Sequence, residues 1–268
     1  MNPRLRMALI LLVSALLGAG AVWFLDGGGD NEAAVTTTTT TTELVTTTEG
    51  QTTTTTAPPQ TSLVAQALST EIDLYADATS AAPVRSLTDD EATSVPGAIP
   101  MVFLAVEDTM APDATRIEVY LPIRPNGSRG FVEVTDVAIT PITFRIEVDV
   151  TAHTIRVFDG DDVVLEEPIG VGTTDRPTPG GIYYIKELLQ PPSPNGPYGV
   201  YAYGLSGFST VLTSFNGGQG VIGIHGTNQP EALGSDVSSG CIRLHNDAIT
   251  RLVDEIGLPL GTPVEILE

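Results

Sequence analysis

A threonine tract limits how much of this chain can contribute to a packed fold. Fifteen of the twenty-one residues from 36 to 56 are threonine, and Ala-Pro-Pro follows directly. The tract has no apolar periodicity, so it cannot bury enough surface to offset the entropy that ordering it would cost. We expect residues 26–62 to be a disordered linker or stalk. About 200 later residues remain, enough for one or two domains.

Residues 1–25 have the features of a membrane segment. Arg4 and Arg6 precede an uncharged apolar run, residues 7–25, and a helix of that length spans about 30 Å, the thickness of a bilayer's hydrocarbon core. Because the basic residues lie only on its N-terminal side, the segment would place the rest of the chain outside the membrane. We predict a retained single-pass anchor. A cleaved secretory signal, with the small residues at 19–21 as its cleavage site, is the alternative.

The net charge argues against one class of partner. The chain carries a formal charge of −21, and its twelve Lys and Arg residues form no cluster. Nucleic-acid binding depends on clustered basic side chains that contact phosphates. We therefore expect no nucleic-acid partner.

The region after the linker shows two different apolar patterns. In residues 63–78 the apolar side chains at 64, 68, 72 and 75 have helical spacing, which predicts a helix. From about residue 99 apolar residues alternate with polar ones, on both sides of a turn-rich loop that contains Asn126. We predict that residues 63–141 form a small all-β module with a possible leading helix. A spacer and a binding module are both open as its role.

Residues 142–268 predict a second, mainly β domain with one helix. Phe144, Ile146 and Val148 alternate with polar residues, as in a half-buried strand, and Asp-Gly-Asp-Asp at 159–162 is typical of a hairpin turn. Further short apolar runs are separated by loops rich in Gly and Pro, and the last run lies at 262–267. The helix is expected at 246–256, where apolar residues recur on one face.

The single cysteine, Cys241, is the first candidate for chemistry. Without a second cysteine it forms no internal disulfide, so it is either a small buried apolar side chain or a reactive thiol. It follows Ser-Ser-Gly and precedes Ile242 and Arg243, close to the start of the expected helix. Backbone N–H groups and a cation there would stabilise a thiolate and lower its pKa. This context favours a nucleophile.

A nucleophilic thiol needs a base within hydrogen-bond reach, and the chain has three histidines. His153 is expected in a turn between strands, and His245 at the start of the helix. His225 ends an apolar strand, where a side chain can be held rigidly, so we predict that His225 is the base. A backbone carbonyl, such as that of Gly226, would hold its second ring nitrogen.

The stretch IHGTNQPEALGSDVSSGCIRLHN, residues 224–246, resembles the signature of the YkuD-type L,D-transpeptidase catalytic domain. That signature reads His-Gly, a variable loop, and then Ser-x-Gly-Cys-x-Arg. RPTPGGIYYI and PYGVYAYGLSG are similar to upstream parts of the same family, so the resemblance covers residues 142–267. It implies a β-sandwich or barrel with one helix. The module at 63–141 in turn resembles, loosely, the SH3-like modules that often precede this domain in cell-wall enzymes.

The resemblance implies a role for each matching residue. Cys241 would be the nucleophile, His225 the general base and acid, and the Gly226 carbonyl would orient the imidazole. The backbone N–H groups of Gly240 and Cys241 would form an oxyanion hole. The remaining matches would contact substrate: Arg243, Ser238, and Ser239, which stands where the family often has His.

The activity that the resemblance implies is cysteine acyl transfer on peptidoglycan, in cell wall biogenesis and the control of cell shape. Cys241 would attack a tetrapeptide stem, release D-Ala, and pass the acyl group through a thioester to an amine of another stem. The product would be a 3→3 cross-link, and acylation of Cys241 by carbapenems is implied as well. No metal or other cofactor is implied. The partners would be stem peptides and, through residues 1–25, the bacterial membrane, with the catalytic domain outside it in the cell wall.

Three other interpretations are open. An L,D-carboxypeptidase would use the same residues, with water resolving the thioester. A catalytically silent wall-binding scaffold is disfavoured by the intact pair of Cys241 and His225. A zinc site of His225, Cys241, His245 and Asp236 has suitable residue types, but it lacks a second thiol or a clustered pair of ligands.

Overall fold

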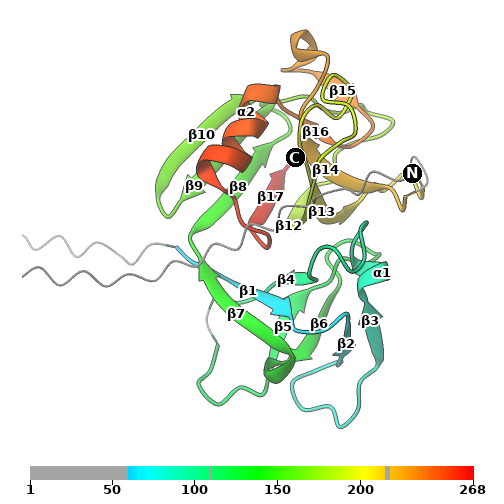
Figure 1. Cartoon of the computed structure of the whole chain (residues 1–268), viewed down its shortest axis with the longest axis vertical. Helices are drawn as coiled ribbons and strands as arrows, with labels where there is room; N and C mark the ends of the chain where they lie inside the picture. Colours follow the sequence, from blue (N-terminus) through cyan, green and yellow to red (C-terminus); the bar gives the residue numbers. More distant parts are fainter. Residues whose placement is uncertain (1–59, 109, 215–217) are drawn as a thin grey trace, which may run out of the picture. The chain divides into compact units, whose positions relative to one another are not determined.

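The structure, a computed structural model, is mainly β, and most of its strand pairs are antiparallel (Figure 1). It describes residues 60–268 except residue 109 and residues 215–217, and these belong to one compact unit. The predicted anchor, residues 1–25, lies outside this part of the chain, as does nearly all of the predicted linker, residues 26–62. No helix within the described part is long and apolar enough to cross a membrane.

Residues 62–142 form a small sheet and two hairpins. The sheet has the strand order β4-β1-β7 with antiparallel pairing, and the hairpins are β2-β3 and β5-β6. The elements are β1 (Ser62–Ala67), β2 (Glu71–Leu74), β3 (Arg85–Thr88), α1 (Asp89–Ala92), β4 (Val102–Leu104), β5 (Arg116–Tyr120), β6 (Arg129–Glu133), the 3-10 turn η1 (Val134–Asp136) and β7 (Val137–Ile142).

The predicted leading helix at 63–78 is wrong, because this segment forms β1 and β2. Val64 pairs with Leu104 across one strand pair, and Ile72 pairs with Leu87 across another. Leu68, one of the four residues with helical spacing, is 66% exposed between the two strands. Two short strands around a turn thus reproduce the four-residue spacing of a helix by chance.

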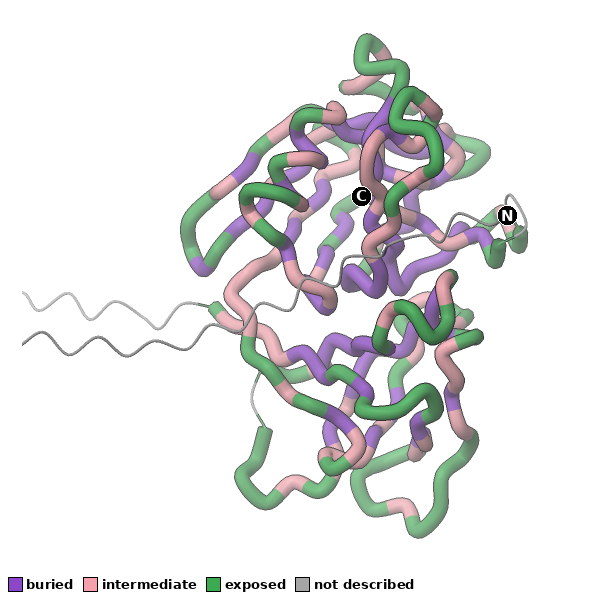
Figure 2. The backbone as a smooth tube through the Cα atoms, viewed as in Figure 1, coloured by how far each residue is buried: buried purple, intermediate pink, exposed green. Residues whose placement is uncertain are grey.

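Residues 144–267 form one eight-stranded sheet with the order β10-β9-β8-β17-β12-β13-β14-β16. The mainly β architecture is therefore as predicted, and the expected hairpin turn lies between β9 and β10. Buried residues follow these strands in Figure 2. The strands are β8 (Phe144–Asp149), β9 (Thr154–Asp159), β10 (Asp162–Pro168), β12 (Gly181–Leu189), β13 (Ala202–Phe208), β14 (Val221–His225), β16 (Ile242–Arg243) and β17 (Pro263–Leu267); β11 (Val171–Gly172) and β15 (Asp236–Ser238) form a separate parallel pair, and η2 (Pro230–Ala232) is a 3-10 turn.

One helical segment lies against this sheet, at the predicted position (Figure 1). It begins as α2 (Asn246–Thr250) and continues as a wider helical turn, η3 (Arg251–Ile256). Ile249 and Leu252 are fully buried in the core that the strands form. Gly257 then ends the segment with φ 69°, the left-handed conformation that glycine adopts readily.

The two halves contact each other through a buried polar cluster beside an apolar one. Ser94 donates hydrogen bonds to the Glu187 carboxylate from its N–H at 2.7 Å and from its hydroxyl at 2.8 Å. Lys186 Nζ donates to the Ala92 carbonyl at 2.7 Å and lies 3.4 Å from Glu187. The apolar contact packs Tyr184 of β12 against side chains of the small module.

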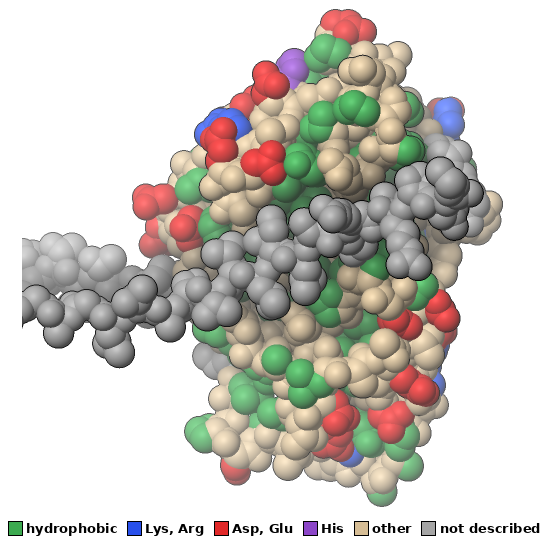
Figure 3. Space-filling view, viewed as in Figure 1, with side chains coloured by type: hydrophobic (Ala, Val, Ile, Leu, Met, Phe, Trp, Pro, Cys, Tyr) green, Lys and Arg blue, Asp and Glu red, His purple; other side chains and the backbone are tan. Residues whose placement is uncertain are grey.

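Acidic side chains are spread over the face drawn in Figure 3, and the basic side chains visible there stand apart from one another. This distribution agrees with the strongly negative formal charge of the whole chain.

Candidate active site

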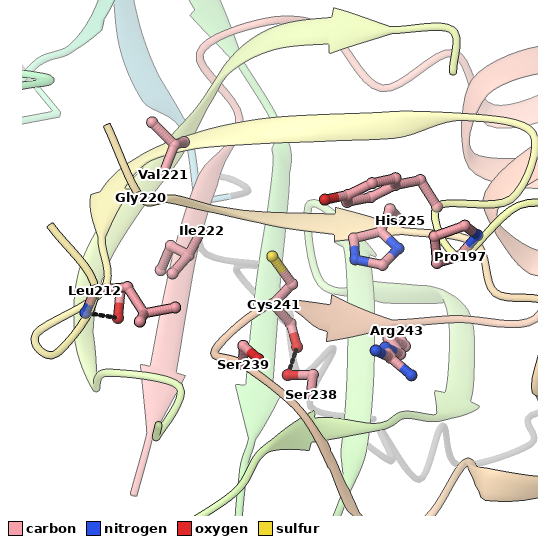
Figure 4. A pocket seen from close by; sticks show the side chains of 12 residues that line it. Pro197, Leu212, Gly220, Val221, Ile222, His225, Ser238, Ser239, Cys241 and Arg243 are labelled. Carbon is pink, nitrogen blue, oxygen red and sulfur yellow. Dashed lines mark hydrogen bonds between the residues drawn. The ribbon is translucent and has the colours of Figure 1, made fainter. Parts of the chain in front are cut away.

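Parallel pairing of β14 and β16 brings the two predicted catalytic side chains together. Ile224 pairs with Ile242 and His225 with Arg243, so Cys241, one residue before β16, lies beside Gly223 of β14, two residues before His225. In Figure 4 the Cys241 sulfur and the His225 ring point into the same pocket, and one ring nitrogen is directed towards the sulfur.

The imidazole of His225 is fixed by a backbone carbonyl. Its Nδ1 lies 2.6 Å from the Gly226 oxygen, and because a carbonyl only accepts, Nδ1 carries the proton and donates. Nε2 is then left with its lone pair, as a general base requires. The Tyr198 ring packs edge-on at 4.9 Å between ring centroids. The expected contact from Gly226 is therefore present in the structure.

Burial keeps this histidine neutral. His225 is 4% exposed, and its pKa is lowered to about 4: desolvation is the largest cause, the hydrogen bond to Gly226 opposes it, and the nearby Arg243 charge adds to the lowering. Near neutral pH the ring is consequently unprotonated and able to accept a proton.

The pKa of the Cys241 thiol differs from the expectation based on the sequence. Desolvation raises its pKa above the ordinary thiol value, and the Gly223 N–H hydrogen bond and the Arg243 charge lower it by less. The predicted lowering of the thiol pKa is wrong, because loss of hydration outweighs the favourable charges. Cys241 therefore rests as a thiol beside a neutral imidazole.

The turn before the cysteine is held by its own hydrogen bonds. Ser238 Oγ donates to the Cys241 carbonyl at 2.6 Å and accepts from the Gly240 N–H at 3.0 Å. Gly240 has φ +115°, and a Cβ added there would lie 3.2 Å from the Pro177 oxygen. The turn therefore needs glycine at this position.

These contacts correct one expectation about the oxyanion hole. The Gly240 N–H is already bonded to Ser238, so in this arrangement it is not a free donor for a substrate oxygen. By contrast, no hydrogen bond among the described residues uses the Cys241 N–H as its donor.

Several supporting residues could not be assigned from the sequence. Thr178 Oγ1 accepts from the Gly172 N–H at 2.8 Å and donates to the Gly240 carbonyl at 3.0 Å. Arg176 donates to Ser239 Oγ at 3.0 Å. Both lie in the RPTPGG motif, which carried the resemblance but no roles. Gly223, which bonds to the thiol, had one weak signal: a glycine inside a strand often marks a close backbone approach.

Asn246 ties the loop after His225 to the helix start. Its Oδ1 accepts from the Thr227 N–H at 3.1 Å. A Cβ added to Gly199 or to Gly226 would lie 2.1 Å from that oxygen. Glycine at 226 therefore permits the approach that keeps its carbonyl against the imidazole.

Two cavities meet at the catalytic pair. One, of about 140 Å³, is lined by His225, Cys241 and all three predicted substrate-binding residues, Ser238, Ser239 and Arg243. A larger cavity, of about 650 Å³, also reaches His225 and Cys241 and has mostly apolar walls. Arg243 Nη1 donates to Gln229 at 3.3 Å, whereas its buried Nε has no partner among the described residues.

The four residues of the zinc interpretation do not form a metal site. Asp236 Oδ1 lies 2.8 Å from His153 Nε2 instead, and His245 is the N-cap residue of α2. Within the described residues, no group of three or more His, Cys, Asp or Glu side chains could hold a metal ion.

Known proteins match this part of the chain. The family model of the YkuD L,D-transpeptidase catalytic domain matches residues 143–266. The YkuD protein of Bacillus licheniformis is 37% identical over 125 residues, which are 47% of this chain and 66% of that relative. The ErfK/SrfK protein of Salmonella typhimurium is 30% identical over 181 residues, 57% of this chain and 52% of that relative. Both relatives are named as L,D-transpeptidases.

The solved structures include an L,D-transpeptidase from Mycobacterium smegmatis, which aligns with a TM-score of 0.39 and 16% identity over 62% of this chain and 90% of that one. The chain spans 66% and 52% of the length of the two curated relatives named above. Residues 143–266, with their His-Gly and Ser-x-Gly-Cys-x-Arg motifs at one pocket, match the YkuD family of L,D-transpeptidase catalytic domains.

Proposed function

We propose that this protein is a peptidoglycan L,D-transpeptidase that forms 3→3 cross-links through a thioester on Cys241. The observation that carries the proposal is the facing pair: a Cys241 thiol and a neutral His225 whose Nε2 is free to accept a proton, in one cavity. A thiol and an adjacent oriented base are what nucleophilic catalysis requires.

The first step is acylation by a donor tetrapeptide stem. Cys241 Sγ attacks the carbonyl of the third stem residue, while His225 Nε2 accepts the thiol proton. The Cys241 N–H, which donates no hydrogen bond within the described residues, would stabilise the oxyanion that forms. His225 then gives its proton to the leaving amine, and D-Ala departs, leaving a thioester.

The second step transfers the acyl group. The side-chain amine of another stem attacks the thioester carbonyl, His225 accepts the amine proton and returns a proton to the sulfur. The products are a new amide and the free thiol, so no metal or nucleotide is consumed. Arg243, with a buried donor directed at no partner, is a candidate for binding a substrate carboxylate, and Ser238 and Ser239 line the same cavity.

The resting state influences when the thiol becomes reactive. Burial disfavours both a free thiolate and an imidazolium, so an ion pair is not formed in advance. We infer that proton transfer accompanies the attack on substrate. This arrangement also protects a lone thiol from oxidation outside the cell, because oxidants react with the thiolate and not with the neutral thiol.

The substrate places the catalytic domain outside the cytoplasmic membrane, in the cell wall. Residues 1–25 would hold it there as an anchor, and the threonine-rich linker would give it reach towards the wall. Both roles are predictions from the sequence.

The test is incubation of the full chain with purified disaccharide-tetrapeptide, followed by mass spectrometry. We expect dimers joined through two third residues, with loss of D-Ala, and none with Cys241→Ala. If only tripeptide accumulates, the protein is an L,D-carboxypeptidase instead. If wild type and Cys241→Ala both leave the tetrapeptide unchanged, the proposal is wrong.

A further inference from the structure

An arginine of the small module binds the backbone next to the catalytic pocket. Arg124, in the connection between β5 and β6, donates to three carbonyls: Nη1 to Ser209 at 2.9 Å, and Nη2 to Leu212 and to Gln219 at 3.0 Å each. These carbonyls lie at the two ends of the connection between β13 and β14. We call residues 208–212 and 219–222 the loop base.

A second side chain of the same connection binds the loop base as well. Asn126 Nδ2 donates to the Phe208 carbonyl at 2.8 Å, and its Oδ1 accepts from the Phe208 N–H at 2.9 Å. The Arg124 guanidinium also lies over the Phe208 ring, 4.8 Å from its centroid. The three hydrogen bonds of Arg124 and these two of Asn126 all join backbone groups of the loop base. They therefore fix the path of its backbone and not the position of a single side chain.

The loop base is a wall of both cavities at the catalytic pair. Ser209 and Leu212 line the smaller cavity, Gln219 lines the larger one, and residues 220–222 line both. Figure 4 shows Leu212, Gly220 and Ile222 on the side of Cys241 opposite His225. Any movement of this backbone would change the shape of the space that faces the sulfur.

The two ends of the loop base are packed closely. The Ser209 N–H donates to the Gly220 carbonyl at 2.8 Å, and the Leu212 N–H donates to Ser209 Oγ at 3.0 Å. A Cβ added to Gly220 would lie 2.3 Å from the Leu212 oxygen. Arg124 donates hydrogen bonds to carbonyls of both ends. It can do so because a planar guanidinium has several donors in a fixed geometry, which a lysine ammonium lacks.

We propose that Arg124 is a positioning residue for substrate binding: it holds the loop base as a wall of the substrate cavity. The small module is then a structural part of the active site and not only a spacer. The inference rests on the proposed function, because it concerns how that reaction's substrate is bound. It requires no contact between Arg124 and substrate.

The experiment compares Arg124→Gln and Arg124→Lys with wild type. The control is Arg129→Gln in the same module, since the Arg129 side chain contacts Tyr120 and, among the described residues, makes no hydrogen bond to the loop base. We expect Arg124→Gln to raise KM for the tetrapeptide about tenfold while kcat changes less, as when binding shared by ground and transition states is lost. Arg124→Lys should lie in between, and Arg129→Gln should match wild type.

Hydrogen exchange gives a readout that does not depend on activity. The amides of Ser209 and Leu212 should exchange faster in Arg124→Gln than in Arg129→Gln. If Arg124→Gln does not fold, Arg124→Lys and Asn126→Ala decide the question by the same two measurements. Unchanged KM together with unchanged exchange would overturn the inference. If wild type itself does not process tetrapeptide, the proposed function fails, and the exchange rates still show whether Arg124 holds the loop base.

Discussion

At the scale of single residues, the protonation states of Cys241 and His225 decide how the site works. Both groups are shifted towards their neutral forms by loss of hydration, although each has neighbours that act in the other direction. A site built in this way depends on the substrate to trigger proton transfer. The two pKa shifts can be measured separately.

The thiol shift predicts slow alkylation at neutral pH. The rate of reaction of Cys241 with iodoacetamide should keep rising with pH beyond the ordinary thiol pKa, because only the thiolate reacts and burial raises the pKa of this thiol. Arg243→Gln should move the midpoint higher still, since the Arg243 charge lowers that pKa. Arg251→Gln, on the exposed side of the helical segment, is the control. A wild-type midpoint below the ordinary value would contradict the prediction.

The histidine shift predicts a loss of stability in acid. The pKa of His225 is about 4 in the folded protein, against an ordinary value of 6.5 that applies to the unfolded chain. Between pH 4 and pH 6.5 the unfolded chain therefore binds more protons than the folded protein. Stability therefore falls as pH drops from 6.5 to 4, by about 3 kcal/mol from this one group. Urea unfolding at several pH values should show this slope in wild type and lose it in His225→Gln. His153→Gln, beside Asp236 at the surface, should keep it; equal slopes for His225→Gln and wild type would refute the assignment.

At the scale of elements, the turn before Cys241 sets the position of the sulfur. We expect Gly240→Ala to lower stability by about 1–3 kcal/mol, because alanine is strained at φ +115° and its Cβ would press on the Pro177 oxygen. Tetrapeptide turnover should fall strongly. Gly234→Ala is a matched control, since Gly234 also has positive φ, +85°, but open space around it. Thermal unfolding and turnover of the two variants check this; similar turnover in both would argue against a special role for the turn.

Alternation and motif spacing explain which elements the sequence could predict. Strands such as β8 and β9 are regular enough to predict, whereas β1 and β2 imitate a helix because a turn at Leu68 separates two short apolar runs. The motif predicted the roles of Cys241 as nucleophile and of His225 as base, since both residues lie within one short stretch. The direction of the thiol pKa was beyond reach, because desolvation depends on burial that only the complete fold creates.

At the scale of the whole molecule, residues far apart in the sequence complete the site. Gly223 reaches the thiol through strand pairing, and Arg124 reaches the loop base from the small module. Gly223 carries only the weak signal of a glycine inside a strand, and no local pattern marks Arg124, because the positions of both residues follow from topology. The contacts between the two halves should therefore matter for the stability of the complete described fold.

The buried pair of Lys186 and Glu187 offers a test of that coupling. Glu187 is 1% exposed, accepts two hydrogen bonds from Ser94 and lies 3.4 Å from Lys186 Nζ. Glu187→Gln would leave the buried ammonium without its carboxylate, and breaking such a pair destabilises a fold by about 3 kcal/mol or more. Replacing both charges, Lys186→Met with Glu187→Leu, should recover part of this loss, because no unpaired charge remains. The exposed ion pair between Arg85 and Glu91 provides the control, and Glu91→Gln should lower the free energy of unfolding by about 0.5 kcal/mol or less. Urea unfolding measures all three, and equal losses for Glu187→Gln and Glu91→Gln would show that the buried cluster does not hold the two halves together.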